Sequence, residues 1–283
     1  MGKTSFAAIP ALAFAAGIMA IAAGPAEAGA VFGQASYNAV FTFTDALPST
    51  TMTVAFDGTN YYSSSGGGSG SPYAEYDASG TLIGTNSPGI DFRSVFTDAS
   101  GNLYARGYAS NQIWKQTAFG SFSPYVTLTG GSLDDQSAVV LNTAGTGYIS
   151  QSGGTISEWD LTGTFIGTVT LSGFGINGEN SYPQDRGIAS VGNYWLTYNT
   201  NNDVLSAWDT SGNRVDTTVL NGAGTSVDSG FSYSYANGMF FVVDQAGGTW
   251  RGYDAVPAPE PASLALFCAG LVGLGWVRRN RVK

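Results

Sequence analysis

The chain of 283 residues contains no histidine and a single cysteine, Cys268, near its C-terminus. Without histidine it cannot assemble a Ser-His-Asp triad, a Cys-His dyad or the usual histidine-bearing zinc site. A single cysteine also excludes an intramolecular disulfide. We therefore expect a protein that is not an enzyme and that has no metal site and no cofactor. Calcium, which carboxylate oxygens bind, stays open as an alternative, although no loop with regularly spaced oxygen donors is present.

Positive charge is scarce as well. Residues 29–258 keep 18 of the 20 acidic residues of the chain, all except Glu27 and Glu260, and have a net charge of −12. The only cations in this segment are Arg93, Arg106, Lys115, Arg186, Arg214 and Arg251. Nucleic acid binding requires clustered cations that displace counterions, so we expect no nucleic acid partner. Few charges, much Gly, Ser and Thr, and many aromatic residues favour an exported all-β protein.

The N-terminus has the layout of a secretory signal peptide. An apolar segment of small residues covers 7–23, and residues 26–28 (Ala-Glu-Ala) fit the small-x-small cleavage rule. We predict a signal peptide over residues 1–28 and a mature chain that begins at Gly29. An N-terminal membrane anchor is the alternative, but Pro10 interrupts the apolar run.

The C-terminus carries a second targeting pattern over residues 256–283. A Pro-Glu-Pro triplet precedes an apolar run over 262–277, and a cluster of cations follows that run. The triplet is Pro259, Glu260 and Pro261, and the cations are Arg278, Arg279, Arg281 and Lys283. This layout resembles the sorting tail of the PEP-CTERM family, exported bacterial proteins whose tail an exosortase processes. The resemblance implies a Gram-negative producer, an exosortase as partner, and an exopolysaccharide or biofilm context.

The apolar run in this tail is slightly shorter than the about 17 to 25 residues of a spanning helix, and its cations would stay on the cytoplasmic side. We expect a C-terminal transmembrane sorting helix that anchors the chain transiently in the inner membrane. A permanent anchor is the alternative, but it would not need the Pro-Glu-Pro triplet. After processing, we expect the protein in the periplasm, on the outer surface or outside the cell.

The segment between the two ends, residues 29–255, repeats itself. Five β-prone segments each have an aromatic residue near their end, at steps of 38, 45, 49 and 45 residues. These aromatic residues are Tyr76, Trp114, Trp159, Trp208 and Tyr253. Three of them lead into an Asp-x-(Ser/Thr)-Gly turn at Asp77, Asp160 and Asp209. Asp caps such turns and Gly supplies their positive φ. A period in the forties indicates a solenoid or a propeller.

A second set of Asp/Asn-Gly turns lies between these aromatic residues, so each unit contains four short strands. Four antiparallel strands in about 45 residues form one propeller blade. The fifth unit has only three strands, whereas an unassigned strand over 39–44 precedes the first unit. We therefore predict a five-bladed β-propeller that this N-terminal strand closes. Another blade count and a right-handed β-helix are the alternatives.

Several acidic residues lie outside the repeated turns. Most precede the first strand of a unit, on one rim of the predicted propeller, and they form our candidate ligand rim: Asp91, Asp134, Asp135, Glu179, Asp185 and Asp228. The bland interpretation is that these acids cap loops and face water. Arg93 and Arg186 follow rim acids closely, so we expect them to pair with those carboxylates. The long loop over 174–183 is a second place where a ligand could bind.

These observations favour an exported, non-catalytic binding or structural propeller, with a glycan or an envelope protein as its possible partner. The alternative is a carbohydrate-active enzyme, because two carboxylates that face one sugar suffice for glycoside hydrolysis. A scaffold that docks another envelope protein is a third possibility. The sequence does not rank a scaffold against a glycan binder.

Overall fold

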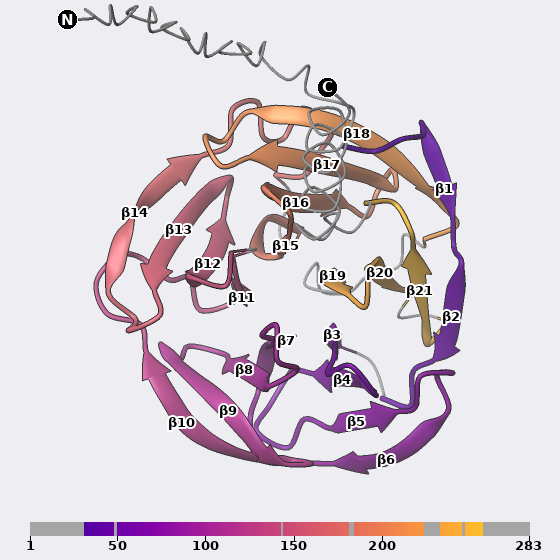
Figure 1. Ribbon diagram of the computed structural model, residues 1–283, viewed down its shortest axis with the longest axis vertical. Helices are drawn as coiled ribbons and strands as arrows, with labels where there is room; N and C mark the ends of the chain where they lie inside the picture. The colour runs from indigo at the N-terminus through magenta and orange to yellow at the C-terminus, as the bar shows by residue number, and fades with distance from the viewer. Residues whose placement is uncertain are drawn as a thin grey trace, which may run out of the picture.

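The computed structural model describes residues 31–47, 50–142, 144–180, 184–223, 233–244 and 247–256. Within these residues five sheets of four or five strands are arranged around a central axis (Figure 1). The only helical element described is a 3-10 turn, η1 (Gln184–Arg186). The all-β, five-bladed propeller that the sequence predicts is confirmed.

Each blade runs from an innermost first strand to an outermost fourth strand. The first blade contains β3 (Thr51–Phe56), β4 (Tyr61–Ser65), β5 (Tyr73–Tyr76) and β6 (Leu82–Asn86). The second contains β7 (Phe92–Thr97), β8 (Leu103–Gly107), β9 (Gln112–Ala118) and β10 (Ser121–Thr127). The third contains β11 (Val139–Leu141), β12 (Gly147–Ser152), β13 (Thr155–Asp160) and β14 (Phe165–Thr170). The fourth contains β15 (Ala189–Val191), β16 (Tyr194–Asn199), β17 (Val204–Asp209) and β18 (Arg214–Asn221). The fifth contains β19 (Tyr233–Ala236), β20 (Met239–Asp244) and β21 (Thr249–Tyr253).

The N-terminal part of the described chain lies against the last two blades. β2 (Phe41–Thr44) pairs antiparallel with β21 and is the outermost strand of the fifth blade. β1 (Ser36–Asn38) pairs in parallel with β18 and adds a fifth strand to the fourth blade. The sequence did not predict β1, because three residues are too few to show a period.

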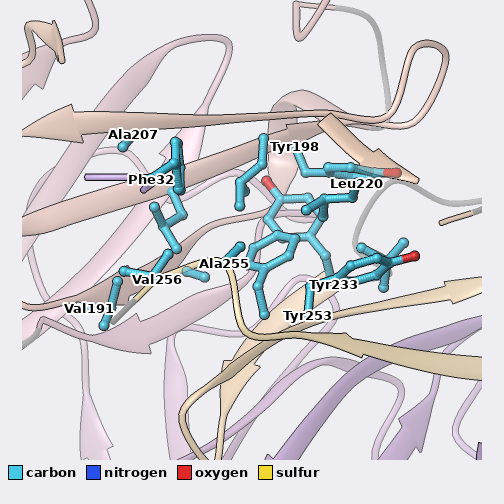
Figure 2. Close-up of a cluster of buried hydrophobic side chains, with 14 of the residues drawn as sticks. Phe32, Val191, Tyr198, Ala207, Leu220, Tyr233, Tyr253, Ala255 and Val256 are labelled. Atoms are coloured by element: carbon cyan, nitrogen blue, oxygen red, sulfur yellow. The ribbon is translucent and has the colours of Figure 1, made fainter. Parts of the chain in front are cut away.

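Five hydrophobic clusters hold the ring together, and each contains side chains from two neighbouring blades. Trp159 packs with Phe96 and Tyr148 between the second and third blades. Between the fourth and fifth blades, Phe32, Tyr198, Tyr233 and other buried residues form the cluster shown in Figure 2. Because every cluster is shared, burial in one blade stabilises the next.

The cluster of Figure 2 also contains the two ends of the described chain. Val31 and Phe32 lie in it together with Ala255 and Val256, and all four are buried. The described chain therefore packs into the body as far as Val256, the first residue of the predicted sorting tail. The predicted signal peptide, the predicted C-terminal helix and Asp228 lie outside the described residues. Within the described ranges, no helix has the length and apolar character needed to cross a membrane.

Candidate functional site

The propeller has two unlike faces, which follow from the up-and-down path of its strands. One face, called the turn face below, carries the turns from first to second strand and from third to fourth strand. The other, called the loop face, carries the loops from second to third strand and the connections between blades. The candidate ligand rim belongs to the loop face, because its acids precede the first strands.

On the turn face, the carboxylates of acidic residues accept hydrogen bonds from backbone amides of their own turns. Oδ1 of Asp77 accepts hydrogen bonds from the amide of Ser79 at 2.8 Å and from the amide of Thr81 at 2.9 Å. Asp160 and Asp209 accept equivalent pairs of bonds from residues two and four positions later. The hydroxyl of Ser79 is the main cause that lowers the pKa of Asp77. The prediction that these three acids cap turns is confirmed.

On the loop face, Asp91 is paired as the sequence predicts. Its Oδ1 lies 2.7 Å from Nη1 of Arg93 and accepts the amide of Gly67 at 2.8 Å. Nε of Arg93 donates to Oε1 of Gln136 at 2.6 Å, and the guanidinium lies over the ring of Tyr108. This arginine therefore links the second blade to the connection that precedes the third.

Two further rim carboxylates converge on one arginine. Oδ1 of Asp134 lies 3.0 Å from Nε of Arg186, and Oδ2 of Asp185 lies 2.8 Å from Nη1 of the same side chain. The other oxygen of Asp185 is buried and has no hydrogen-bond partner among the described residues. Burial raises the pKa of Asp185, while Arg186 partly offsets that effect. This pair is the only place in the described rim where two carboxylates share one cation.

Beneath Asp134 and Asp135 lies a fully buried cation, Arg106. Its guanidinium donates to the carbonyl oxygens of Asp134, Asp135, Ser137 and Ser110 at 2.7 to 3.0 Å. Burial lowers the pKa of Arg106 to about 10, so it stays charged at neutral pH. The side chain of Asp135 is exposed. Arg106 fastens the connection between the second and third blades from below.

Glu179, in the long loop of the third blade, is fully buried. Its carboxylate accepts the hydroxyl of Ser206 at 2.7 Å and the amide of Asn177 at 3.0 Å, with Nη1 of Arg214 at 3.8 Å. The side chain of Asn199 donates to the carbonyl of Asn177. Glu179 thus holds the loop on the fourth blade, because its carboxylate contacts protein donors.

Asp45, which follows β2, is an acid of the loop face that is not among the predicted rim residues. It is buried and accepts hydrogen bonds from the hydroxyls of Thr51 at 2.6 Å and Tyr76 at 2.8 Å, and from the amide of Leu47 at 3.1 Å. The hydroxyl of Ser63 is a weaker donor at 3.3 Å. Burial raises the pKa of Asp45 despite these donors. Asp45 ties the fifth blade to the first, as Arg93 and Arg106 tie later blades.

A cavity of about 330 Å³ lies on the central axis at the turn face. The first strands of four blades line it with Phe96, Val140, Ala189 and Tyr235 among others. Its polar lining comes mainly from residues at the strand ends and turns: Thr97, Asp98, Asn142, Ser190, Ser234 and Asn237. This cavity and the candidate ligand rim are therefore at opposite ends of the first strands.

Within the described ranges, no group of three acidic side chains is arranged to hold a metal ion. Asp91, Asp134, Asp185 and Glu179 are each committed to a cation or to protein donors. These four acids therefore belong to a network that joins blades, in which Asp185 is buried with one unpartnered oxygen, whereas Asp135 is exposed and Asp228 lies outside the described residues.

The likeness to one solved structure supports the fold class. The chain is similar to a glutaminyl cyclase from Myxococcus xanthus with a TM-score of 0.57 at 9% identity, covering 80% of this chain and 99% of that one. It is also similar to a streptogramin B lyase with a TM-score of 0.42 at 16% identity, covering 78% and 73% of the two chains. At these identities the likeness concerns the fold alone. No curated protein matches the sequence.

These findings define the protein as a β-propeller that carries a C-terminal sorting motif. Residues 257–279 match the family of the PEP-CTERM protein-sorting motif, which begins one residue after the buried Val256. The sorting motif predicted from the sequence is confirmed. It is a substrate signal for an exosortase, and it marks the chain as an exported protein that is transiently anchored in the membrane.

Proposed function

We propose that the protein is a non-catalytic binding or structural propeller that an exosortase delivers to the cell envelope or the extracellular space, in an exopolysaccharide context. The observation that carries the proposal is the sorting motif directly after a five-bladed propeller. The commitment of the rim carboxylates to ion pairs and hydrogen bonds supports a structural frame. A glycan or another envelope protein is the proposed partner.

The ends of the chain complete this proposal. Residues 1–28 serve as a signal peptide, and the apolar run over 262–277 serves as the transient transmembrane helix. The pairing of β2 with β21 serves to close the ring, since it places the first part of the mature chain beside the last strand. Closure of this kind leaves the last blade without an unpaired outer position that would invite aggregation.

The intact mass of protein recovered from producing cells tests the sorting proposal. We expect a mature N-terminus at Gly29 and a C-terminus from which Cys268 and the terminal arginines have been removed. A matched variant with Ala in place of Pro259, Glu260 and Pro261 should keep the tail. A wild-type mass that retains Cys268 contradicts the proposal.

A second candidate function rests on Asp134 and Asp185. Because Asp185 is buried, has one unpartnered oxygen and has a raised pKa, it has the character of a general acid, with Asp134 close to the same arginine. This alternative is a carbohydrate-active enzyme that uses two rim carboxylates. It predicts reducing sugar released by the wild type but not by Asp134→Asn or Asp185→Asn. Binding of sugar without product favours the non-catalytic proposal.

A further inference from the structure

The two ends of the central axis differ in how much room they offer. At the loop face, Arg93, Arg106 and Arg186 occupy the blade connections with their carboxylate and carbonyl partners. At the turn face, the about 330 Å³ cavity lies among the first strands. That volume is at the lower end of the about 300 to 1,000 Å³ typical of small-molecule sites. A ligand of the propeller therefore fits the turn face better than the candidate ligand rim.

The charge of the cavity restricts what it can bind. Among the described residues that line the cavity there is no cation, and the one carboxylate is Asp98. Oδ1 of Asp98 accepts the amides of Ser100 and Asn102 at 2.9 Å, and its Oδ2 accepts from Nδ2 of Asn102 at 2.8 Å and from the hydroxyl of Tyr104 at 3.0 Å. A carboxylate with four donors has little capacity left for a cationic ligand, and it repels an anionic one.

What remains suits a neutral molecule with hydroxyl groups on an apolar frame. Phe96, Val140 and Tyr235 supply apolar and aromatic wall. Asn142 and Asn237 supply amides beside the mouth, and each uses only part of its hydrogen-bonding capacity: Asn142 on Thr146, and Asn237 on the hydroxyl of Tyr61. Sugar rings combine apolar C–H faces with hydroxyls that both donate and accept.

We infer that the turn-face cavity is a binding site for a neutral sugar ring, which enters from the side opposite the candidate ligand rim. The inference rests on the proposed function, because it names the ligand class and the site of that proposed binding propeller. It places the contacts on Asn142, Asn237, Phe96 and Tyr235 and assigns the rim acids to structure.

Two substitutions to tryptophan on the same face test the site. Ala144 is exposed at the cavity and lines it, whereas Ala78 is exposed in a turn of the first blade and does not line it. The full-length protein is applied to an array of neutral hexose oligosaccharides and uronic acid oligosaccharides, and the affinity for the best neutral ligand is measured by calorimetry. We expect Ala144→Trp to weaken that affinity by at least about tenfold and Ala78→Trp to leave it unchanged.

Each result has a distinct meaning. Loss of binding in Ala144→Trp alone supports the inference. Binding that survives in Ala144→Trp, a preference for uronic acid oligosaccharides, or no binding to any sugar overturns it. The intact mass of the same preparation reports the sorting proposal separately, so a processed protein without sugar binding overturns only the inference. Circular dichroism of both variants verifies that the added side chains leave the fold intact.

Discussion

The loop face and the turn face of the propeller both carry acids, but they use them in opposite ways. On the loop face, Asp45 and Asp185 are buried, and burial raises the pKa of each carboxyl. On the turn face, hydrogen bonds inside exposed turns lower the pKa of Asp77 and Asp160. The loop face therefore uses charge to join blades at an electrostatic cost, whereas the turn face uses charge locally and leaves the central cavity open.

The largest loss of stability should come from replacing Arg106 on the loop face. Arg106→Ala removes a fully buried side chain and leaves four carbonyl oxygens on the loop face without their donor. We expect a loss of about 3–5 kcal/mol in the free energy of unfolding, which for a protein of this size lowers Tm by about 10 °C or more. Thermal unfolding followed by circular dichroism measures it.

Arg106→Lys is the matched control for this prediction. Lysine keeps the charge but lacks the planar fork, so it reaches fewer of the four carbonyls at once. We expect Tm between those of the wild type and Arg106→Ala. Equal Tm values for wild type and Arg106→Ala would show that the buried arginine does not hold the blade connection.

The next largest loss of stability is expected when one acid of each face is replaced by alanine. Asp45→Ala and Asp98→Ala each remove a carboxylate that accepts four hydrogen bonds, but Asp45 is buried and Asp98 is half-buried. We expect a loss of about 2–3 kcal/mol for Asp45→Ala, since its donors stay dry, and about 1 kcal/mol for Asp98→Ala, since water replaces the acceptor. Urea unfolding of both variants measures the difference. Equal losses would contradict the distinction between the faces.

The repeat is visible in the sequence because its causes are local. Asp-x-(Ser/Thr)-Gly turns such as the one at Asp160 depend on residues within four positions of each other, and each blade repeats them. Pairing of Asp91 with Arg93 is visible for the same reason. These short-range patterns suffice to predict the four strands of each blade and the blade number, but not β1.

The long-range contacts are what the sequence conceals. Arg106 binds carbonyls of residues 28 to 31 positions away, and the backbone oxygens that accept from it carry no sequence signature. Asp45 accepts a hydrogen bond from the hydroxyl of Tyr76, 31 positions later. The turn-face cavity cannot be predicted from the sequence for another reason. Asp98, Asn142 and Asn237 have the sequence pattern of turn residues, and they do lie at turns. Only the arrangement of the blades in a ring brings them together at one axis.

The raised pKa of Asp185 predicts that the stability of the protein depends on pH. A raised folded pKa means that the folded state binds the proton of Asp185 more tightly than the unfolded chain does, so stability falls as pH rises from about 4 through the folded pKa. Asp185→Asn removes this titration. The free energy of unfolding of Asp185→Asn, compared with that of the wild type, should therefore shift in favour of the variant as pH rises from about 4 to about 7. Parallel pH profiles of Tm for wild type and variant would exclude this role of Asp185.

The smallest expected effect is a change in the pKa of one acid, Asp160, in a single turn of the turn face. The hydroxyl of Thr162 donates to Oδ1 of Asp160 at 2.6 Å and is the first cause of the lowered pKa of that acid. In Thr162→Ala the backbone donors of Thr164 and of position 162 remain, so the turn persists while the pKa of Asp160 moves up toward its ordinary value. NMR titration of the Asp160 carboxyl carbon measures the change. Thr168→Ala, an exposed change on the neighbouring strand, should leave that pKa where it is. An unchanged pKa of Asp160 in Thr162→Ala would mean that backbone amides alone lower the pKa of acids on the turn face. The acids of the two faces would then differ in burial and not in the hydroxyl residues that the repeat places in its turns.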